Sequence, residues 1–196
     1  MRIAHLSDLH VLALAGVSPH RFFNKRLTGY ANLRLKRKHI HRRGYVEAIA
    51  KEITVSKIDH VVVTGDLTNL ALEAEFEAAR DLLENGLGLS PKDVSVVPGN
   101  HDLYTAGALR KRRFTEFFAE YIKSDLPDLA ANTPLGAFPF VRLRGPCAII
   151  GLTSAVPRLP FVASGNIGRA QLEAFGKIME HPEVAKRTPV ILIHHP

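Results

Sequence analysis

The sequence predicts an α/β protein whose central sheet is largely parallel. Short apolar runs rich in β-branched residues alternate with segments whose apolar residues recur at helical spacing. The length of 196 residues suits one domain, and 46% hydrophobic with 23% charged residues is the balance of a globular protein with a core. We therefore expect one catalytic domain over residues 1–196, with a basic insert at residues 18–44.

The first half of the chain predicts three strands and three helices. The run "IDHVVVTGD" is β-branched and ends in glycine, as a buried strand does. Leu72, Phe76, Ala79 and Leu83 recur at helical spacing, and Asn85-Gly86 marks the end of that helix. The predicted elements, in order, are strand 2–6, helix 45–56, strand 58–66, helix 72–86, strand 93–100 and helix 108–123.

The second half predicts a loop, two joined strands, a helix and a last strand. Residues 124–136 read as a loop, and Gly145-Pro146 joins the apolar runs "FPFVRLRG" and "PCAIIGL". A helix over residues 169–180 and a strand at 189–193 follow. Of the other histidines, we expect His5 to pack in the core and His60 to lie at the surface or its boundary.

Polar side chains follow four of the predicted strands. In α/β sheets, sites form outside the carboxyl ends of the strands, where separate loops converge. Aspartate, histidine and asparagine are ligands suited to Zn²⁺, Mn²⁺ or iron. An Asp or Asn after a strand is common in turns. Four such polar motifs, each at the end of an apolar strand, favour a metal site. The residues are Asp8, His10, Asp66, Asn100, His101, Asp102 and His194.

The spacing of these residues suggests how two ions are held. Asp8 and His10 are two residues apart, so in an extended segment they point the same way. The two oxygens of Asp66 can bridge a pair of ions, and the acid of Asp102 can orient the His101 imidazole. Two ions about 3.5–4 Å apart activate a water and bind a phosphoryl oxygen.

These motifs resemble those of the calcineurin-like metallophosphoesterase superfamily. The matching stretches are "SDLH" (7–10), "GDLTN" (65–69), "GNHD" (99–102) and "IHHP" (193–196). Within the superfamily, "GDLT", "GLTSA" (151–155) and the region from "GNIGRAQLEAF" to "PVILIHHP" most resemble the class III cyclic-nucleotide phosphodiesterase-like branch. The resemblance implies a β-sandwich flanked by helices (αββα).

The resemblance also implies a role for each residue. Asp8 and His10 would bind one divalent ion (Mn²⁺, Fe²⁺/Fe³⁺ or Zn²⁺), Asp66 would bridge two, and Asn100 and His194 would bind the second. His101 would act as general acid or transition-state stabiliser, with Asp102 orienting it. A metal-bridging hydroxide would attack the phosphorus of a phosphodiester. We expect His195 to support the centre or face the substrate rather than bind metal.

One element of the superfamily pattern, Gly-His-x-His, does not occur in these residues. Its two histidines normally complete both metal sites. We therefore expect a catalytic domain truncated at its C-terminus, with an incomplete sandwich, weak metal binding and poor turnover. The alternative is that a partner subunit, water or a nearby residue fills the gaps.

Two rivals to a phosphodiesterase of cyclic nucleotides or similar esters remain open. One is a nuclease or lipid-pyrophosphate hydrolase of the same superfamily, which the basic insert supports. Nucleases of the double-strand-break repair type tend to carry an aromatic residue and an acid after "GDL". This chain has Thr68 and Asn69 there, which disfavours the nuclease. The other rival is a non-catalytic scaffold with a decayed metal centre, which the intact ligand residues oppose.

The net charge of +7 favours anionic partners such as a phosphate-ester substrate. Nine Lys or Arg residues and no acid lie between Arg21 and Arg43, interleaved with aromatic and leucine residues. Residues 21–43 could cover the active-site edge, lie on an anionic membrane surface or contact nucleic acid, the last being least favoured. The single cysteine and the absence of a secretory signal favour a cytoplasmic protein, peripheral to the membrane if the insert binds lipid.

Overall fold

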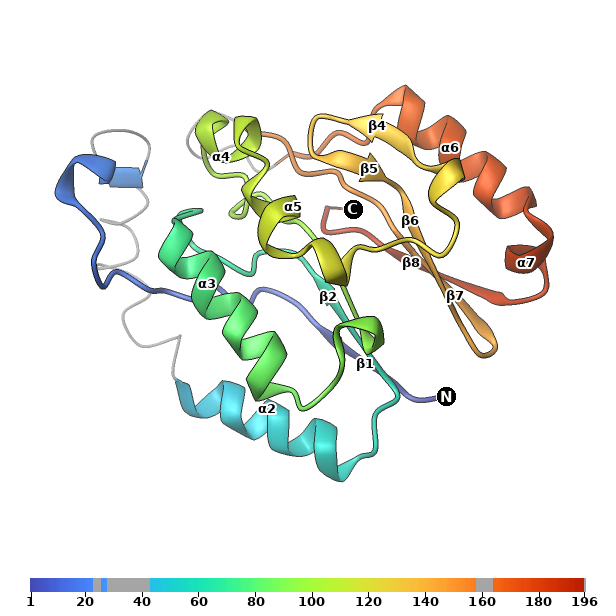
Figure 1. The fold of residues 1–196 in the computed structure, drawn as a ribbon, viewed down its shortest axis with the longest axis horizontal. Coiled ribbons are helices and arrows are strands. Elements are labelled where there is room, and N and C mark those ends of the chain that lie inside the picture. Colours follow the sequence, from blue (N-terminus) through green and yellow to red (C-terminus); the bar gives the residue numbers. More distant parts are fainter. Residues whose placement is uncertain (23–25, 28–42, 158–163, 196) are drawn as a thin grey trace.

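The computed structural model describes residues 1–22, 26–27, 43–157 and 164–195. Within these residues the strands form two three-stranded sheets and one two-stranded hairpin. The two sheets lie between helices α2 and α3 on one side and α6 and α7 on the other (Figure 1). The predicted α/β class and the helix-flanked sandwich are therefore confirmed. Most of the predicted basic insert, including residues 28–42, lies outside the described residues.

The first sheet is fully parallel and has the order β1-β2-β3. Its strands are β1 (Ile3–Leu6), β2 (His60–Thr64) and β3 (Val94–Val97). The register pairs Leu6 with Val63 and Thr64 with Val97, so the three strands end at one edge. Helices α2 (Arg43–Val55) and α3 (Glu73–Asp81) follow β1 and β2 in the chain. The loops after the strands consequently meet at that edge.

The second sheet has the order β6-β7-β8 and mixes directions. Strands β6 (Phe140–Arg144) and β7 (Cys147–Gly151) are antiparallel, and β8 (Thr188–Leu192) is parallel to β7. The prediction of largely parallel pairing holds for the first sheet and for β7–β8, whereas β6 and β7 are antiparallel because only Gly145 and Pro146 separate them. A parallel pair needs a crossover of about a dozen residues. Helices α6 (Arg169–Glu180) and α7 (Pro182–Ala185) provide that crossover for β8.

Two apolar cores hold the layers together. The larger core joins both sheets to helices α2, α3 and α5 (Arg113–Phe117); Val63 and Val96 of the first sheet belong to one buried cluster with Ile149 of the second sheet and Phe76 of α3. Neighbouring residues of the second sheet point the other way, as strand geometry requires. They form a smaller core with α6 and α7, made of Val141, Ala148, Ile150, Ile178 and Val184.

The helix predicted over residues 108–123 is broken into three pieces. They are α4 (Ala106–Arg110), α5 (Arg113–Phe117) and the 3₁₀-helix η4 (Ala119–Tyr121). Arg112 lies between the first two with φ 48°, which ends α4 and redirects the chain. The break lets Phe114, Phe118 and Tyr121 all become buried. Helical periodicity alone does not reveal such a redirection.

The predicted loop at residues 124–136 also contains regular structure. It holds the 3₁₀-helix η5 (Pro127–Leu129) and β4 (Ala131–Thr133), which pairs with β5 (Gly136–Phe138). Strands of three residues are too short to show a period of two in the sequence. The other short helices are η1 (Pro19–Phe22), the π-helical turn η2 (Leu82–Gly86) and η3 (Pro91–Asp93). Across the described ranges, no helix combines the length and apolar character needed to cross a membrane.

The predictions for His5 and His60 are both wrong. His5 is exposed at the edge strand β1, and its Nε2 lies 2.7 Å from Thr64 Oγ1. His60 is fully buried, with its Nε2 2.9 Å from Ser95 Oγ. Burial, with the nearby Arg142 and Arg144, lowers the pKa of His60 to about 4. A neutral imidazole bonded to a hydroxyl can therefore take the place of an apolar side chain in this core.

Candidate metal centre

The predicted site residues meet at the carboxyl ends of strands from both sheets. Asp8 and His10 follow β1, Asp66 follows β2, Asn100 and His101 follow β3, and His194 follows β8. The segment after β1 runs beside the segment after β2. The amide of Asp8 donates to the Gly65 carbonyl at 3.2 Å, and that of His10 to the Asp66 carbonyl at 2.8 Å.

Three of the predicted ligands have left-handed backbone conformations. The φ angles are 56° for Asp8, 46° for His10 and 53° for Asp66. A non-glycine residue in this region is uncommon, and such conformations cluster where surrounding structure holds a functional group in place. The turns after β1 and β2 thus aim their polar side chains at the edge of the sheet.

Two glycines let the loops approach closely. A Cβ on Gly65 would lie 2.5 Å from His194 Nδ1, and a Cβ on Gly99 would lie 2.1 Å from Asp66 Oδ1. Both distances are shorter than real contacts allow. The glycines of "GD" and "GN" are therefore needed for clearance around Asp66 and His194.

The first cluster of donor atoms lies around His10. Its Nε2 is 3.6 Å from Asp8 Oδ1 and 3.7 Å from Asp66 Oδ2. His10 and Asp66 are buried, whereas Asp8 is exposed. One imidazole and two carboxylates therefore face a common point that can be reached from solvent on the Asp8 side.

The second cluster lies around His194 and uses the other oxygen of Asp66. His194 Nε2 is 3.2 Å from Asn100 Oδ1 and 3.5 Å from Asp66 Oδ1. His194 Nδ1 is 2.8 Å from the Thr64 carbonyl, which can only accept, so the proton of a neutral ring is on Nδ1. Nε2 then presents a lone pair toward two oxygens, an arrangement that a bound cation stabilises.

The donor atoms fit divalent transition metals. Bonds of about 2.0–2.2 Å place adjacent ligand atoms roughly 3.0–3.6 Å apart in octahedral or tetrahedral geometry. The separations in the two clusters, 3.2 to 3.7 Å, are close to this range. Two overlapping groups, His10–Asp66–His101 and Asp8–Asp66–His194, each have donor atoms within 4.8 Å of one another. Asp66 belongs to both groups, as expected of a bridging ligand.

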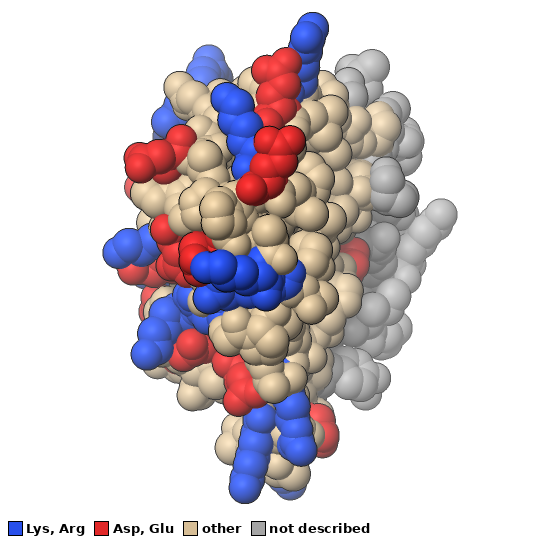
Figure 2. Space-filling view, turned by 90° about the vertical axis from the view of Figure 1, so that its right-hand side faces the viewer, with Lys and Arg blue, Asp and Glu red and all other residues tan. Residues whose placement is uncertain are grey.

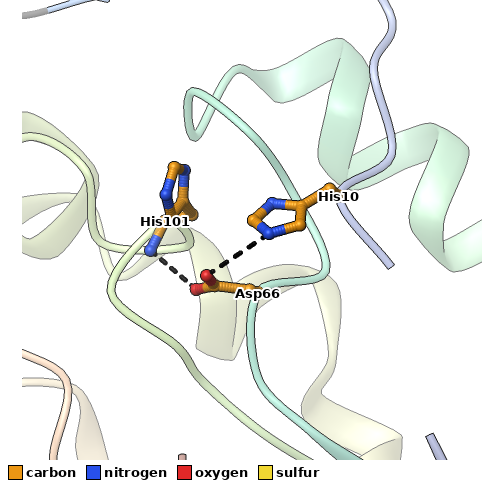
Figure 3. A group of neighbouring side chains, drawn as sticks. All are labelled: His10, Asp66 and His101. Atoms are coloured by element: carbon orange, nitrogen blue, oxygen red, sulfur yellow. Dashed lines mark hydrogen bonds and ion pairs between the residues drawn. The ribbon is translucent and has the colours of Figure 1, made fainter. Parts of the chain in front are cut away.

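His101 lies beside the clusters, and three groups fix its ring. The Nδ1–H donates to the Asn69 carbonyl at 2.7 Å, and the Tyr104 ring stacks on the imidazole with centroids 5.4 Å apart. The His10 ring meets it edge-on at 4.8 Å. Figure 3 shows Asp66 between the two histidines, where its Oδ1 accepts from the His101 amide at 2.8 Å. Because Nδ1 is bonded to a carbonyl, Nε2 is the nitrogen that can exchange a proton with a substrate.

Asp102 has partners other than the His101 imidazole it was expected to orient. Its carboxylate is fully buried and accepts from the amides of Gly99 and Thr68, both at 2.9 Å, and from the Thr68 hydroxyl at 3.0 Å. Burial, followed by the neighbouring Asp66 charge, raises the pKa of Asp102 to about 6. The carboxylate joins the loop after β2 to the loop after β3.

Asn69 is a functional residue that the sequence reasoning missed. It is buried; its carbonyl receives the His101 Nδ1–H, and its side-chain amide donates to the His10 carbonyl. The available signal was a polar residue three positions after Asp66 in "GDLTN".

His195, expected to support the centre or face the substrate, has its Nδ1 2.9 Å from Ser154 Oγ. A Cβ on Gly165 would lie 2.8 Å from the same nitrogen.

Comparison with known proteins agrees with this geometry. No curated protein matches the chain. The family model described as calcineurin-like phosphoesterase matches residues 1–196, so it covers every element that contributes to the centre. The chain therefore belongs to the calcineurin-like phosphoesterase family.

Proposed function

We propose that this protein hydrolyses phosphodiesters, with a cyclic nucleotide or similar ester as substrate, using two divalent ions. Asp8 and His10 would hold one ion, Asn100 and His194 would hold the other, and Asp66 would contact both. The observation that carries the proposal is the division of the Asp66 carboxylate, with Oδ2 toward His10 and Oδ1 toward His194. Family membership supports a phosphate ester as substrate.

The chemistry divides between the ions and the chain. Bound divalent ions lower the pKa of water and stabilise charge on phosphoryl oxygens. Asp66 would contact both ions, and the fixed ring of His101, when it is protonated on both nitrogens, would give its Nε2 proton to the leaving oxygen. The stacked Tyr104 and the Asn69 carbonyl keep that nitrogen in one direction. No covalent intermediate with the chain is required.

Each cluster supplies three protein donors, fewer than a six-coordinate ion takes. Asp8, His10 and Asp66 form one set, and Asp66, Asn100 and His194 the other. Waters, substrate oxygens or side chains beyond the described residues complete the shells in this proposal. Open positions are characteristic of catalytic rather than structural metal sites.

The experiment combines metal binding with hydrolysis. Mn²⁺ is titrated calorimetrically, and hydrolysis of bis-p-nitrophenyl phosphate, a 3′,5′-cyclic nucleotide and the monoester p-nitrophenyl phosphate is measured at saturating Mn²⁺. Asp66→Asn should lower the diester rate by about a hundredfold or more, since supporting contacts alone are worth roughly 10–100-fold. Asp128→Asn, the same chemical change at an exposed residue of η5, is the matched control.

The outcomes distinguish between the candidate functions. Diester hydrolysis that depends on Asp66 supports the proposal, and a preference for the monoester overturns the diester assignment. Well under one equivalent of bound Mn²⁺ favours the scaffold or a truncated catalytic domain, since weak metal binding is expected of both.

We also propose that the basic stretch 21–43 binds an anionic membrane surface. Its charge supports this, although Arg21 and Arg26, whose side chains are described, contact the protein itself. On the face that carries α6 and α7, basic and acidic side chains alternate (Figure 2), and ion pairs such as Arg187–Glu183 and Arg169–Glu173 neutralise them. Sedimentation with acidic vesicles at low salt tests the proposal; protein left in the supernatant would end it.

A further inference from the structure

The segment Asn69–Leu72, here the 69–72 loop, connects the bridging ligand to helix α3. Its first residue contacts two histidines of the metal centre, through the Asn69 carbonyl to His101 and through the Asn69 side-chain amide to His10. Ala71 has a φ of 51°, a conformation that an alanine does not favour. The loop therefore keeps its shape only if neighbouring groups hold it.

Two buried charged side chains hold the loop from opposite edges. Arg26 is 4% exposed; its Nε donates to the Leu70 carbonyl at 2.7 Å and its Nη2 to the Ala71 carbonyl at 2.8 Å. Glu75, which is fully buried, accepts from the amides of Leu70 at 2.8 Å and Leu72 at 3.1 Å. The planar guanidinium can donate to two carbonyls at once, which a lysine ammonium does less well.

We propose that Arg26 is a positioning residue for His101, acting through the 69–72 loop. By holding the Leu70 and Ala71 carbonyls, Arg26 fixes the two peptides next to the Asn69–Leu70 peptide, which Glu75 holds through the Leu70 amide. It thereby helps to fix the direction of the Asn69 carbonyl, and hence the proton position and ring orientation of His101. Arg26 belongs to the basic stretch 21–43, so that stretch is tied to the catalytic edge through this contact. The kinetic consequence rests on the proposed hydrolase activity; the structural consequence does not.

Removal of Arg26 has a definite effect on the loop. Two buried carbonyls lose donors, and one weaker bond to Ala71 remains, from Arg113 Nη1 at 3.2 Å. Ala71 can then relax toward negative φ, which reorients the Leu70–Ala71 and Ala71–Leu72 peptides. The Asn69–Leu70 peptide keeps its bond to Glu75 through the Leu70 amide but loses the support of its neighbours. The bond from His101 Nδ1 to the Asn69 carbonyl is then weakened, so the ring is less well oriented and its proton is no longer confined to Nδ1.

The first test reads the His101 ring directly in metal-free protein. Long-range ¹H–¹⁵N correlation spectra distinguish the Nδ1–H and Nε2–H forms of each histidine, and His101→Gln assigns the signal. We expect the Nδ1–H form in the unmodified chain and a mixture of both forms in Arg26→Met. Arg21→Met removes one charge from the same cluster, where the Arg21 guanidinium pairs with Glu73 of α3, so it should keep the Nδ1–H form.

The second test measures dependence on the leaving group. Methyl p-nitrophenyl phosphate needs little help from an acid, whereas methyl phenyl phosphate needs a proton at its leaving oxygen. Arg26→Met should lower kcat for the phenyl ester at least about tenfold more than for the nitrophenyl ester, since general acids contribute roughly 10²–10⁴-fold. A general loss of folded protein would lower both rates equally and leave their ratio unchanged.

Arg26→Lys keeps the charge and provides a second variant in case Arg26→Met does not fold. It should shift the ratio and the ring spectrum in the same direction but less far. A wild-type spectrum and rate ratio in Arg26→Met, or in Arg26→Lys if Arg26→Met does not fold, overturns the inference. If the unmodified chain binds Mn²⁺ but hydrolyses neither ester, the proposed function fails, and the ring spectra still decide whether Arg26 positions His101.

Discussion

Gly99 has no room for a side chain, because Asp66 lies directly against it. A Cβ there would be 2.1 Å from Asp66 Oδ1 and 2.4 Å from the Asp66 amide nitrogen. Gly99→Ala must therefore move the Asp66 carboxylate, the proposed bridging ligand. We predict a loss of Mn²⁺ affinity of about 10–100-fold, comparable to the loss of a supporting contact in other metal sites. Calorimetric titration measures it.

Gly176 provides the matched control for this substitution. It lies in α6, and nothing would lie within 4 Å of a Cβ added there. Gly176→Ala should leave the Mn²⁺ affinity unchanged and raise the free energy of unfolding by about 0.5–1 kcal/mol, the helix preference of alanine over glycine. Wild-type Mn²⁺ affinity in Gly99→Ala would contradict the proposed bridging position of Asp66.

Asp102 can be assigned a role by separating stability from rate. In Asp102→Asn the NH₂ group must face either the Gly99 and Leu67 amides or the Thr68 amide, and each of these amides is a donor. We predict a loss of about 1–3 kcal/mol in the free energy of unfolding, the effect of a buried donor left unpaired. Urea denaturation measures it. A changed pH–rate profile with unchanged stability would instead return Asp102 to the role of orienting His101.

At the scale of elements, the break between α4 and α5 depends on a single residue. Arg112 follows α4 with φ 48°, and its amide donates to the Leu109 carbonyl at 2.9 Å. Glycine is the usual residue at this position of a helix end. Arg112→Gly should therefore raise the free energy of unfolding by about 0.5–1 kcal/mol. Thermal unfolding followed by circular dichroism measures the change.

Lys111 is the control for that prediction, because it has φ −84° one position earlier. Lys111→Gly should lower the free energy of unfolding by about 0.5–1 kcal/mol. Lys111 has no left-handed strain that glycine could relieve, and glycine loses more backbone entropy on folding. Equal destabilisation by both substitutions would show that the left-handed turn carries no strain.

The elements differ in how far the sequence alone predicts them. Strands β2, β3 and β7 follow from apolar runs because they are buried, and helix α6 follows from its periodicity because it buries one face. Strands β1 and β8 also follow from apolar runs, although most of their residues are half-buried or exposed. The β4–β5 hairpin and the break at Arg112 do not, since three-residue strands and one unusual φ leave no periodic pattern. The ligand residues are visible as polar side chains after strands, whereas Asn69 and Arg26 act through backbone carbonyls, which no residue type reveals.

At the scale of the whole molecule, a buried acid makes stability depend on pH. Burial raises the pKa of Glu75 to about 7 against an ordinary 4.5, although its hydrogen bonds from the Leu70 and Leu72 amides and the charge of Arg26 oppose the shift. Below pH 4.5 the group is protonated in both folded and unfolded chains. Between about pH 4.5 and 7 the Glu75 carboxyl keeps its proton in the folded chain but loses it in the unfolded chain. Its contribution to the free energy of unfolding, about 3 kcal/mol, is therefore complete below pH 4.5 and is lost as the pH rises through about 7.

Glu75→Gln should remove this part of the pH dependence. Its amide oxygen can still accept from the Leu70 and Leu72 amides, but it does not ionise. Urea denaturation of chelator-treated protein between about pH 4.5 and 8 gives the difference between the two chains, in which other titrating groups cancel. Parallel stability curves for the unmodified chain and the Glu75→Gln variant would show that Glu75 titrates normally.

His194 differs from the other proposed ligands in one respect, because it follows β8 of the second sheet while they follow strands of the first. Ions held between Asp66 and His194 would tie the two halves of the sandwich to each other at their open edge. Metal occupancy and the docking of the sheets would then be linked equilibria, with binding at a hundred times the dissociation constant adding about 2.7 kcal/mol to stability. In a cell, fluctuations in available metal would set the lifetime of the protein as well as its activity.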